Sequence, residues 1–361
     1  MERASRFAIG FPYPCQAAPS GRRYGRRVED LAGAVDQVAA RTGFSGVVRV
    51  DQDGRMVLAK AYGLAHRGYS VANSLDTQFG IASGTKGLTA LVVGSLVEEG
   101  RLDLATTARS VLGEDLPLID DDVTVEHLLA HRSGIGDYFD EDAVESMTDY
   151  VMPVPVHRLV TTNDYLAVLD GHPQVFAPGE RFAYNNGAFV VLALIAERVS
   201  GTPFHELVRT RVCEPAGMRD TGFLRSDEPG GRMALGYLAG DGLRTNVLHL
   251  PVRGSGDGGI FTTAADVSAL WQALYADRIV PRERVADMVR PHSDVPAESA
   301  RYGLGFWLHP TSDAVVLVGG DAGVSFRTVH DEVTGVTHTV LSNTTDGAWP
   351  VSRHLSALLA T

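Results

Sequence analysis

Strand-like apolar runs lie near both ends of the chain, whereas its middle is dominated by the three-to-four-residue spacing of helices. Near the start, GFSGVVRV (43–50) and RMVLAKAYG (55–63) flank the turn sequence DQDG, which predicts two paired strands. Further strands are predicted late in the chain, at 303–308, 314–318, 324–330 and 336–342. We therefore expect one antiparallel sheet that is assembled from both chain ends.

Helices are predicted beside these strands and throughout the middle of the chain. An amphipathic helix is expected over 28–42, and a more apolar one over 83–99, which Gly100 ends. Strands are scarce in the middle, where the spacing predicts helices at 124–131, 163–169, 187–199 and 204–212.

The last third of the chain adds two helices and completes the predicted architecture. Thr262 or Thr263 is expected to cap one helix, and another closes the chain at 350–360. The predicted class is α+β, an α/β/α sandwich with a mainly helical inserted domain. The expected parts are an N-terminal extension at 1–27, a sheet domain at 28–115 and 231–361, and the helical domain at 116–230.

Composition and charge narrow the range of partners. The 361 residues carry a formal net charge of −12, which disfavours binding to nucleic acid or to an acidic membrane surface. No apolar run approaches the roughly 18 residues of a membrane span, and the first 30 residues lack the apolar core of an export signal. A cytoplasmic protein without membrane contact is expected. Cys15 and Cys213 suggest two reduced structural thiols, with no disulfide framework and no metal site.

Lys86 is one of only two lysines in the chain, although 32 residues are lysine or arginine. It follows Ser83 by three residues at the start of the predicted helix, so both side chains share one helical face. A serine hydroxyl becomes a nucleophile when a neighbouring base takes its proton. A lysine with a depressed pKa can be that base, whereas an arginine stays protonated. The alternative is structural, with Ser83 as an N-cap and Lys86 as a solvated first-turn residue.

A second sequence element lies ahead of the apolar helix in PGERFAYNNGAFVVLALIAERVSG, namely Tyr184-Asn185-Asn186. Other blocks in order are DTQFGIASGTKGLTALVVGSLVEEGRLDL, VTVEHLLAHRSGIGDY, GSGDGGIFTTAADVSAL, YGLGFWL and VVLVGGDAGVSF. From about residue 30 onward the chain resembles the serine β-lactamase and penicillin-binding superfamily, specifically its class C β-lactamase, DD-peptidase and esterase branch. The resemblance implies a β-lactamase/transpeptidase-like fold.

The resemblance also implies roles for individual residues. Ser83 would be the nucleophile, and Lys86 its amine partner. Tyr184 would share the proton and pass it to the leaving group, as a phenolate stabilised beside an ammonium. Asn186 would hydrogen-bond to the substrate or to Lys86. The oxyanion hole would use the backbone N–H groups of Ser83 and Asp321.

The third element of the family departs from its usual pattern of lysine or histidine, any residue, then glycine. The preferred placement here is Val318-Gly319-Gly320 followed by Asp321, and a register using Asp321-Ala322-Gly323 is the alternative. In either register the glycines, including Gly320, allow substrate to approach the backbone. The missing cation removes a partner for a substrate carboxylate. This disfavours β-lactamase and DD-carboxypeptidase activity and favours neutral esters, amides or thioesters, unless His309, Arg327 or His330 substitutes for the cation.

Other motifs were weighed against this interpretation. The glycine pattern at 254–259 fits G-x-G-x-x-G but lacks a leading βαβ unit, so a tight backbone approach is favoured over nucleotide binding. His127 and His131 have zinc spacing but no glutamate between them and no third ligand. No serine lies in G-x-S-x-G, which excludes an α/β-hydrolase elbow. The acidic residues near 114–122 and 140–145 are expected in solvated faces and loops rather than in a paired carboxylate site.

The predicted function is serine-dependent acyl-enzyme catalysis. A small-molecule or peptide acyl substrate would be attacked by Ser83 without metal or organic cofactor, with hydrolysis as the default. Acyl transfer in small-molecule biosynthesis is the alternative reaction, and a non-catalytic peptide- or acyl-binding relative is the alternative of another class. The acyl donor, the acceptor and the oligomeric state stay open.

Overall fold

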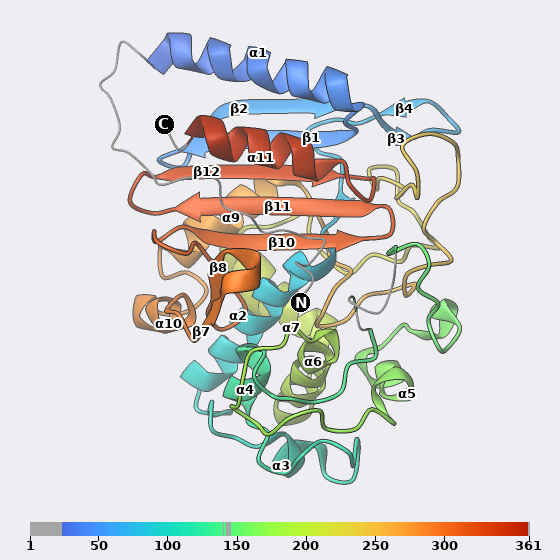
Figure 1. Ribbon diagram of the computed structural model, residues 1–361, viewed down its shortest axis with the longest axis vertical. Helices are drawn as coiled ribbons and strands as arrows, with labels where there is room; N and C mark the ends of the chain where they lie inside the picture. Colours follow the sequence, from blue (N-terminus) through green and yellow to red (C-terminus); the bar gives the residue numbers. More distant parts are fainter. Residues whose placement is uncertain (1–23, 140, 142–145, 360–361) are drawn as a thin grey trace.

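The computed structural model describes residues 24–139, 141 and 146–359. Most of the predicted N-terminal extension, including Cys15, lies outside the described residues. Eight strands form one sheet in the order β2-β1-β12-β11-β10-β9-β8-β7, with antiparallel neighbours throughout (Figure 1). Their bounds are Gly46–Gln52 (β1), Arg55–Tyr62 (β2), Ser293–Val295 (β7), Ala300–Tyr302 (β8), Trp307–Leu308 (β9), Val315–Asp321 (β10), Val324–Asp331 (β11) and Val336–Ser342 (β12).

Strands from the two chain ends lie side by side in this sheet, which confirms the predicted architecture. Strand β1 pairs with β12, so that Val47 lies opposite Leu341 and Val48 opposite Val340. Successive side chains of a strand point to opposite faces. Accordingly, Val47 and Leu341 belong to one apolar core, and Val48 and Val340 belong to another. The sheet is therefore buried on both faces.

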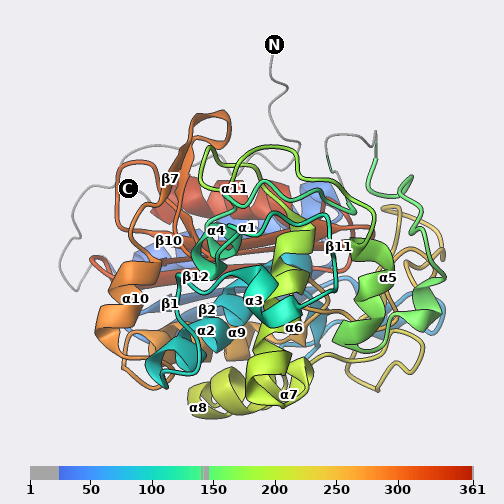
Figure 2. The same cartoon turned by 90° about the horizontal axis from the view of Figure 1, so that it is seen from below.

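Helices cover the two faces separately. Helices α1 (Tyr24–Thr42) and α11 (Ala348–Leu359) pack together over one face, with Val35 and Leu355 fully buried between them and the sheet. Helices α2 (Thr85–Glu98) and α9 (Ala264–Leu274) lie on the opposite face, as the view from below shows (Figure 2). Thr263 caps α9 by accepting a hydrogen bond from the Asp266 N–H, as one of the two predicted caps.

Besides α6 (Asn186–Ser200), whose residues 186–196 are all buried, several further helices contribute to the same apolar core as α2. They are α3 (Ala108–Leu112), α4 (Val125–Leu129), α5 (Leu166–Leu169), α7 (Phe204–Val208), α8 (Glu214–Ala216) and α10 (Arg282–Met288). Two short antiparallel pairs complete the fold: β3 (Leu64–His66) with β4 (Val71–Ala72), and β5 (Phe79–Gly80) with β6 (Phe261–Thr262). The boundaries of the inserted domain stay a prediction.

Two predicted elements differ from the structure. The strand expected at 303–308 is interrupted between β8 and β9, because Gly305 has a positive φ of 85° and lies directly against α2. A Cβ at this position would be 2.3 Å from the Cβ of Ala90. The helix expected over 204–212 stays α-helical only in α7 and continues as a π-helical turn at Arg209–Cys213.

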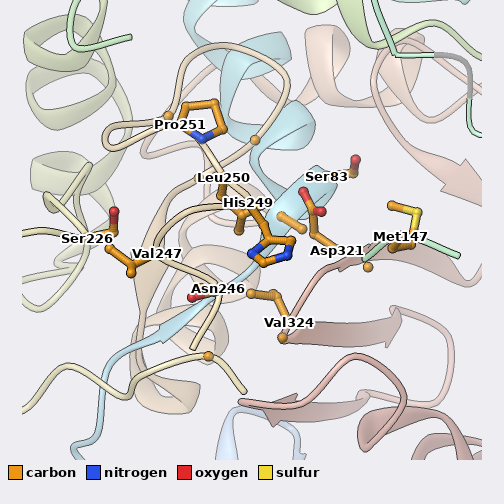
Figure 3. Close-up of a pocket in the computed structure, with 18 of the residues that line it drawn as sticks. Ser83, Met147, Ser226, Asn246, Val247, His249, Leu250, Pro251, Asp321 and Val324 are labelled. Atoms are coloured by element: carbon orange, nitrogen blue, oxygen red, sulfur yellow. The ribbon is translucent and has the colours of Figure 1, made fainter. Parts of the chain in front are cut away.

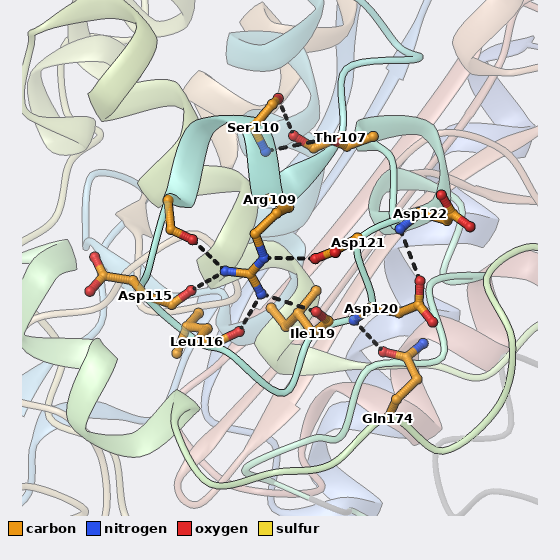
Figure 4. A network of polar contacts seen from close by, with 11 residues as sticks. Thr107, Arg109, Ser110, Asp115, Leu116, Ile119, Asp120, Asp121, Asp122 and Gln174 are labelled. Atoms are coloured by element: carbon orange, nitrogen blue, oxygen red, sulfur yellow. Dashed lines mark hydrogen bonds and ion pairs between the residues drawn. The ribbon is translucent and has the colours of Figure 1, made fainter.

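Arg109 of α3 organises the acidic loop that follows this helix (Figure 4). Its guanidinium donates hydrogen bonds to the carbonyl oxygens of Gly113, Asp115, Leu116 and Ile119, and to the carboxylate of Asp121. One planar group thereby satisfies four backbone acceptors that would otherwise need water. The acidic segment is a structural loop, as the sequence predicted.

Within the described part of the chain, no single helix is long and apolar enough to cross a membrane. One pair, 186–200 with 204–216, passes that test only jointly and is bent by 86°. The same residues contain no group of three or more histidine, cysteine, aspartate or glutamate side chains arranged to hold a metal ion.

Candidate active site

Ser83 lies in a single 3-10 turn (η1, Ala82–Gly84) between β5 and α2. The turn is fixed by backbone hydrogen bonds from Gly84 to Ile81 and from Ile81 to Ile260. Ala82 has a positive φ of 43°, a conformation that costs a residue with a side chain about 1 kcal/mol or more. Ser83 does not cap the helix, because α2 starts at Thr85 without a side-chain cap. The structural alternative of an N-cap serine is therefore wrong, and the hydroxyl is available for other contacts.

Lys86 reaches back from the first turn of α2 to Ser83. Its Nζ lies 2.9 Å from Ser83 Oγ, 2.8 Å from Asn186 Oδ1 and 2.9 Å from the carbonyl oxygen of Asp257. The residue is only 2% exposed, and this burial lowers the pKa of its amine, although nearby carboxyl groups oppose the shift. In the neutral form the lone pair of Nζ can accept the Ser83 hydroxyl proton. The other two contacts can be made by the two remaining N–H groups.

Tyr184 approaches the same hydroxyl from the start of α6. Its phenol is hydrogen-bonded to Ser83, and its ring centroid lies 5.0 Å from Lys86 Nζ. Stacking on Trp307 at 6.0 Å and contact with His131 at 4.4 Å, both between ring centroids, hold the ring in place. Burial raises the pKa of Tyr184 well above its ordinary value, and Glu141 adds to the shift.

Burial acts against the phenolate and ammonium pair expected from the sequence. Desolvation lowers the pKa of Lys86 and raises that of Tyr184, so both shifts favour neutral groups. In its neutral form the amine can act as a base toward Ser83, and the neutral phenol can act as a proton donor on the other side. The physical reason is that each ion would lose its hydration in this position.

Asn186 is the first residue of α6, and it is held in place by an aspartate that the sequence analysis did not identify. The carboxylate of Asp137 accepts hydrogen bonds from the N–H of Asn186 at 2.6 Å and of Gly187 at 2.9 Å. The side-chain oxygen of Asn186 faces Lys86, whereas its amide nitrogen donates to the Phe139 carbonyl and to Glu141. Of the two partners considered for Asn186, the structure shows Lys86.

Burial raises the pKa of Asp137 to about 6, despite the backbone N–H groups that it accepts. Its position at the N-terminus of α6 favours the negative charge. The only available signal was its place in the family-like block VTVEHLLAHRSGIGDY. No pattern in that block says that Asp137 would meet a helix start 49 residues later.

The third element lies along β10, directly against the nucleophile turn. A Cβ on Gly319 would be 2.0 Å from the Ile81 carbonyl oxygen and 2.8 Å from the Ser83 nitrogen, so only glycine fits. This close approach puts Val318-Gly319-Gly320 beside Ser83 and favours the first of the two registers. Residues 322 and 323 instead form the turn to β11, where Asp321 pairs with Val324. The role of the Asp321 N–H in an oxyanion hole stays a prediction.

The glycine-rich segment 254–259 packs tightly behind the site. The Asp257 carbonyl accepts a hydrogen bond from Lys86, and its carboxylate accepts one from the Tyr138 hydroxyl. A Cβ at Gly256 would be 2.0 Å from the Phe189 carbonyl oxygen. These glycines therefore serve backbone packing, as expected, rather than phosphate binding.

A cavity opens in front of Ser83 (Figure 3). Most of its wall is apolar, with Phe139, Met147, Tyr150, Met152, Tyr165, Leu224, Met233, Leu235, Val247, Leu250, Pro251, Val252, Phe261 and Val324. Gly320 and three carboxyl-bearing residues, Glu141, Asp257 and Asp321, also line it. The expectation of a solvated face at 140–145 is therefore wrong for Glu141, and residues 140 and 142–145 lie outside the described residues. Among the described residues, no lysine or arginine side chain faces this space.

None of the three candidates for the missing cation reaches the cavity. Arg327 is buried on β11, next to Phe326, which belongs to the core on the α2 side. Because neighbouring residues of a strand face opposite sides, Arg327 points toward α11. Burial lowers the pKa of Arg327 to about 10, and the charge of Arg353 adds to this shift. His330 packs on Trp271 and Tyr275, and His309 is not among the lining residues either.

Comparison with known proteins places this geometry in context. Residues 31–360 match the family described as Beta-lactamase. Esterase EstB of Burkholderia gladioli is 31% identical over 76% of this chain and 77% of its own length. PbpX of Bacillus subtilis is 27% identical over 75% of this chain, and the match spans only 63% of that protein. A penicillin-binding protein of Bacillus halodurans has a similar structure, with a TM-score of 0.84 and 32% identity over 90% of this chain and 99% of that one.

Proposed function

The chain belongs to the β-lactamase family, as a serine hydrolase of that type, and on this premise we propose that it is an esterase that acylates Ser83 with uncharged substrates. Ser83 Oγ attacks the ester carbonyl, and neutral Lys86 accepts the hydroxyl proton. When the tetrahedral intermediate collapses, the bond from the carbonyl carbon to the leaving oxygen breaks. Tyr184 protonates that oxygen and recovers a proton from Lys86. Water then attacks the acyl group by the reverse sequence and regenerates the serine.

The contact between Lys86 and Ser83 is the observation that carries this proposal. An amine 2.9 Å from the hydroxyl is within reach of direct proton transfer. Its burial lowers the proton affinity of an otherwise strongly basic group, toward the range in which a base works near neutral pH. The two other contacts of Nζ fix its direction, and Asp137 fixes Asn186 in turn.

The wall of the cavity supports an uncharged ester as substrate. A substrate carboxylate would enter a space with three carboxyl-bearing residues and no lysine or arginine side chain among the described lining residues. The cost of desolvating that carboxylate would have no lysine or arginine partner to offset it. Aliphatic or aromatic acyl groups can instead bury their apolar surface against the lining side chains.

Hydrolysis of chromogenic short-chain esters tests the proposal, with penicillin as the anionic comparison. We expect turnover of the neutral ester that is lost in Ser83→Ala and in Lys86→Met. Lys60→Met is the matched control, because Lys60 is the only other lysine and makes a partly exposed ion pair with Asp36. Added alcohols or amines separate acyl transfer from hydrolysis. Ligand binding without Ser83-dependent turnover would refute the esterase and favour a binding protein.

A further inference from the structure

We propose that Asp321 selects substrates that carry an ammonium group close to the scissile carbonyl, an inference that rests on the proposed function of Ser83. Asp321 is the last residue of β10, the strand that touches the nucleophile turn through Gly319. Its carboxyl group lies in the cavity between Ser83 and His249 (Figure 3). A substrate whose carbonyl reaches Ser83 therefore passes this carboxyl group.

Each of the three carboxyl groups of the cavity accepts at least one hydrogen bond within the protein. Glu141 accepts one from the Asn186 amide, and Asp257 accepts one from the Tyr138 hydroxyl. Asp321 accepts through Oδ1 only, from the N–H of the next residue, Ala322. Its Oδ2 accepts no hydrogen bond from any described residue. Asp321 therefore has one carboxyl oxygen left for a donor on the substrate, in the cavity that holds Ser83.

The surroundings of Asp321 favour a cation over an anion. The negative charges of Asp257 and Glu141 both raise the pKa of Asp321, because they repel a negative charge on its carboxyl group. Lys86 provides opposite charge only when protonated, and the proposed mechanism needs it neutral. An ammonium group beside Asp321 would relieve the repulsion among the three carboxylates and replace water as a donor.

The apolar wall defines the remainder of such a substrate. Val324 and Met147 flank the Asp321 end of the cavity, and Leu250 and Pro251 lie across from them (Figure 3). A branched aliphatic or aromatic body can pack there while the amine meets Asp321. The substrate class is therefore an amphipathic ester or amide with an amine near its carbonyl, in contrast to the anionic compounds that a cationic third element would bind.

Three methyl esters with one branched aliphatic skeleton test this inference. They carry hydrogen, a primary amine or a carboxylate at the β-carbon, and kcat/KM is measured for each with the wild type and with Asp321→Asn. We expect the ratio of amine to hydrogen compound to be about 10 to 100 in the wild type, as for a hydrogen bond between charged groups. The ratio should fall toward 1 in Asp321→Asn, and the carboxylate compound should be the slowest.

Asp294→Asn is the matched control, because Asp294 is exposed on β7 and should leave the ratio unchanged. A wild-type ratio near 1, or a high ratio that Asp321→Asn preserves, would overturn the inference while Ser83-dependent turnover still supported the esterase. If the wild type turns over none of the esters, calorimetry measures the affinity of Ser83→Ala for the amides that correspond to the three esters. Equal affinity for the amine and hydrogen amides would overturn the inference by itself.

Discussion

The buried carboxyl group of Asp321 should lower the stability of the protein above neutral pH, and Asp321→Asn should remove that cost. Burial and two neighbouring carboxyl groups raise the pKa of Asp321 to about 7. The folded protein therefore holds this proton more tightly than the unfolded chain does. Such a group supports the fold fully below its unfolded pKa, and the support is lost as the pH rises through the folded pKa. Asparagine keeps the acceptor for the Ala322 N–H but does not titrate.

The size of the effect follows from the shift. The pKa rises from an ordinary value of 3.8 to about 7, which is roughly three units. Each unit corresponds to about 1.4 kcal/mol of free energy, so the wild type should lose about 4 kcal/mol relative to Asp321→Asn between pH 4 and 8. This is a large part of the 5–15 kcal/mol by which folded domains are typically stable. Asp137 and Asp257 also titrate with raised pKa values but remain in both proteins.

Urea unfolding of both proteins, followed by tryptophan fluorescence and circular dichroism over about pH 4 to 8, measures this difference. We expect the difference in free energy of unfolding between Asp321→Asn and the wild type to be smallest at low pH. The difference should grow as the pH rises, with the variant more stable. Asp294→Asn should show no pH-dependent difference from the wild type. A constant difference between Asp321→Asn and the wild type at every pH would refute the reasoning that burial of this carboxyl group disfavours its charge.

Three further predictions concern the catalytic unit and the strand beside it. Lys86→Met should lower kcat/KM for a neutral ester by about 100- to 10,000-fold, because the base is lost. Its stability to urea should be preserved, because an apolar chain replaces a buried amine. Lys60→Met should change neither quantity appreciably. Tyr184→Phe should lower kcat/KM by about 100-fold or more with a near-native unfolding midpoint, since only the hydroxyl is lost; an active variant would remove the phenol from the mechanism. Gly319→Ala should lower both activity and thermal stability, because its Cβ would meet a carbonyl at 2.0 Å, whereas Gly222→Ala, with nothing within 4 Å, should be tolerated.

Much of the fold could be predicted because its signals are local. Strand-like runs at both chain ends indicate one sheet, and β1 indeed pairs with β12. Ser83 and Lys86 are three residues apart, so helical geometry alone brings their side chains together. The interruption between β8 and β9 could not be predicted in the same way. It depends on how closely Gly305 approaches a helix that is distant in the sequence.

The parts of the site that escaped prediction depend on long-range packing. Asp137 acts through the start of α6, and the Asp257 carbonyl is a backbone group that no side-chain pattern reveals. The pKa shifts of Lys86 and Tyr184 follow from burial, and a sequence does not give the degree to which a position is shielded from water. The register at Gly319 became clear only from its distance to the turn of Ser83.

Intact-mass spectrometry after brief incubation with an ester tests the central claim most directly, because it detects the acyl group on the protein itself. Ester, thioester and penicillin probes are applied separately to the wild type and to Ser83→Ala. We predict a mass increase equal to the acyl group with the ester probe, present in the wild type and absent in Ser83→Ala. Ester hydrolysis without any adduct, or an adduct that persists in Ser83→Ala, would contradict an acyl-enzyme on Ser83.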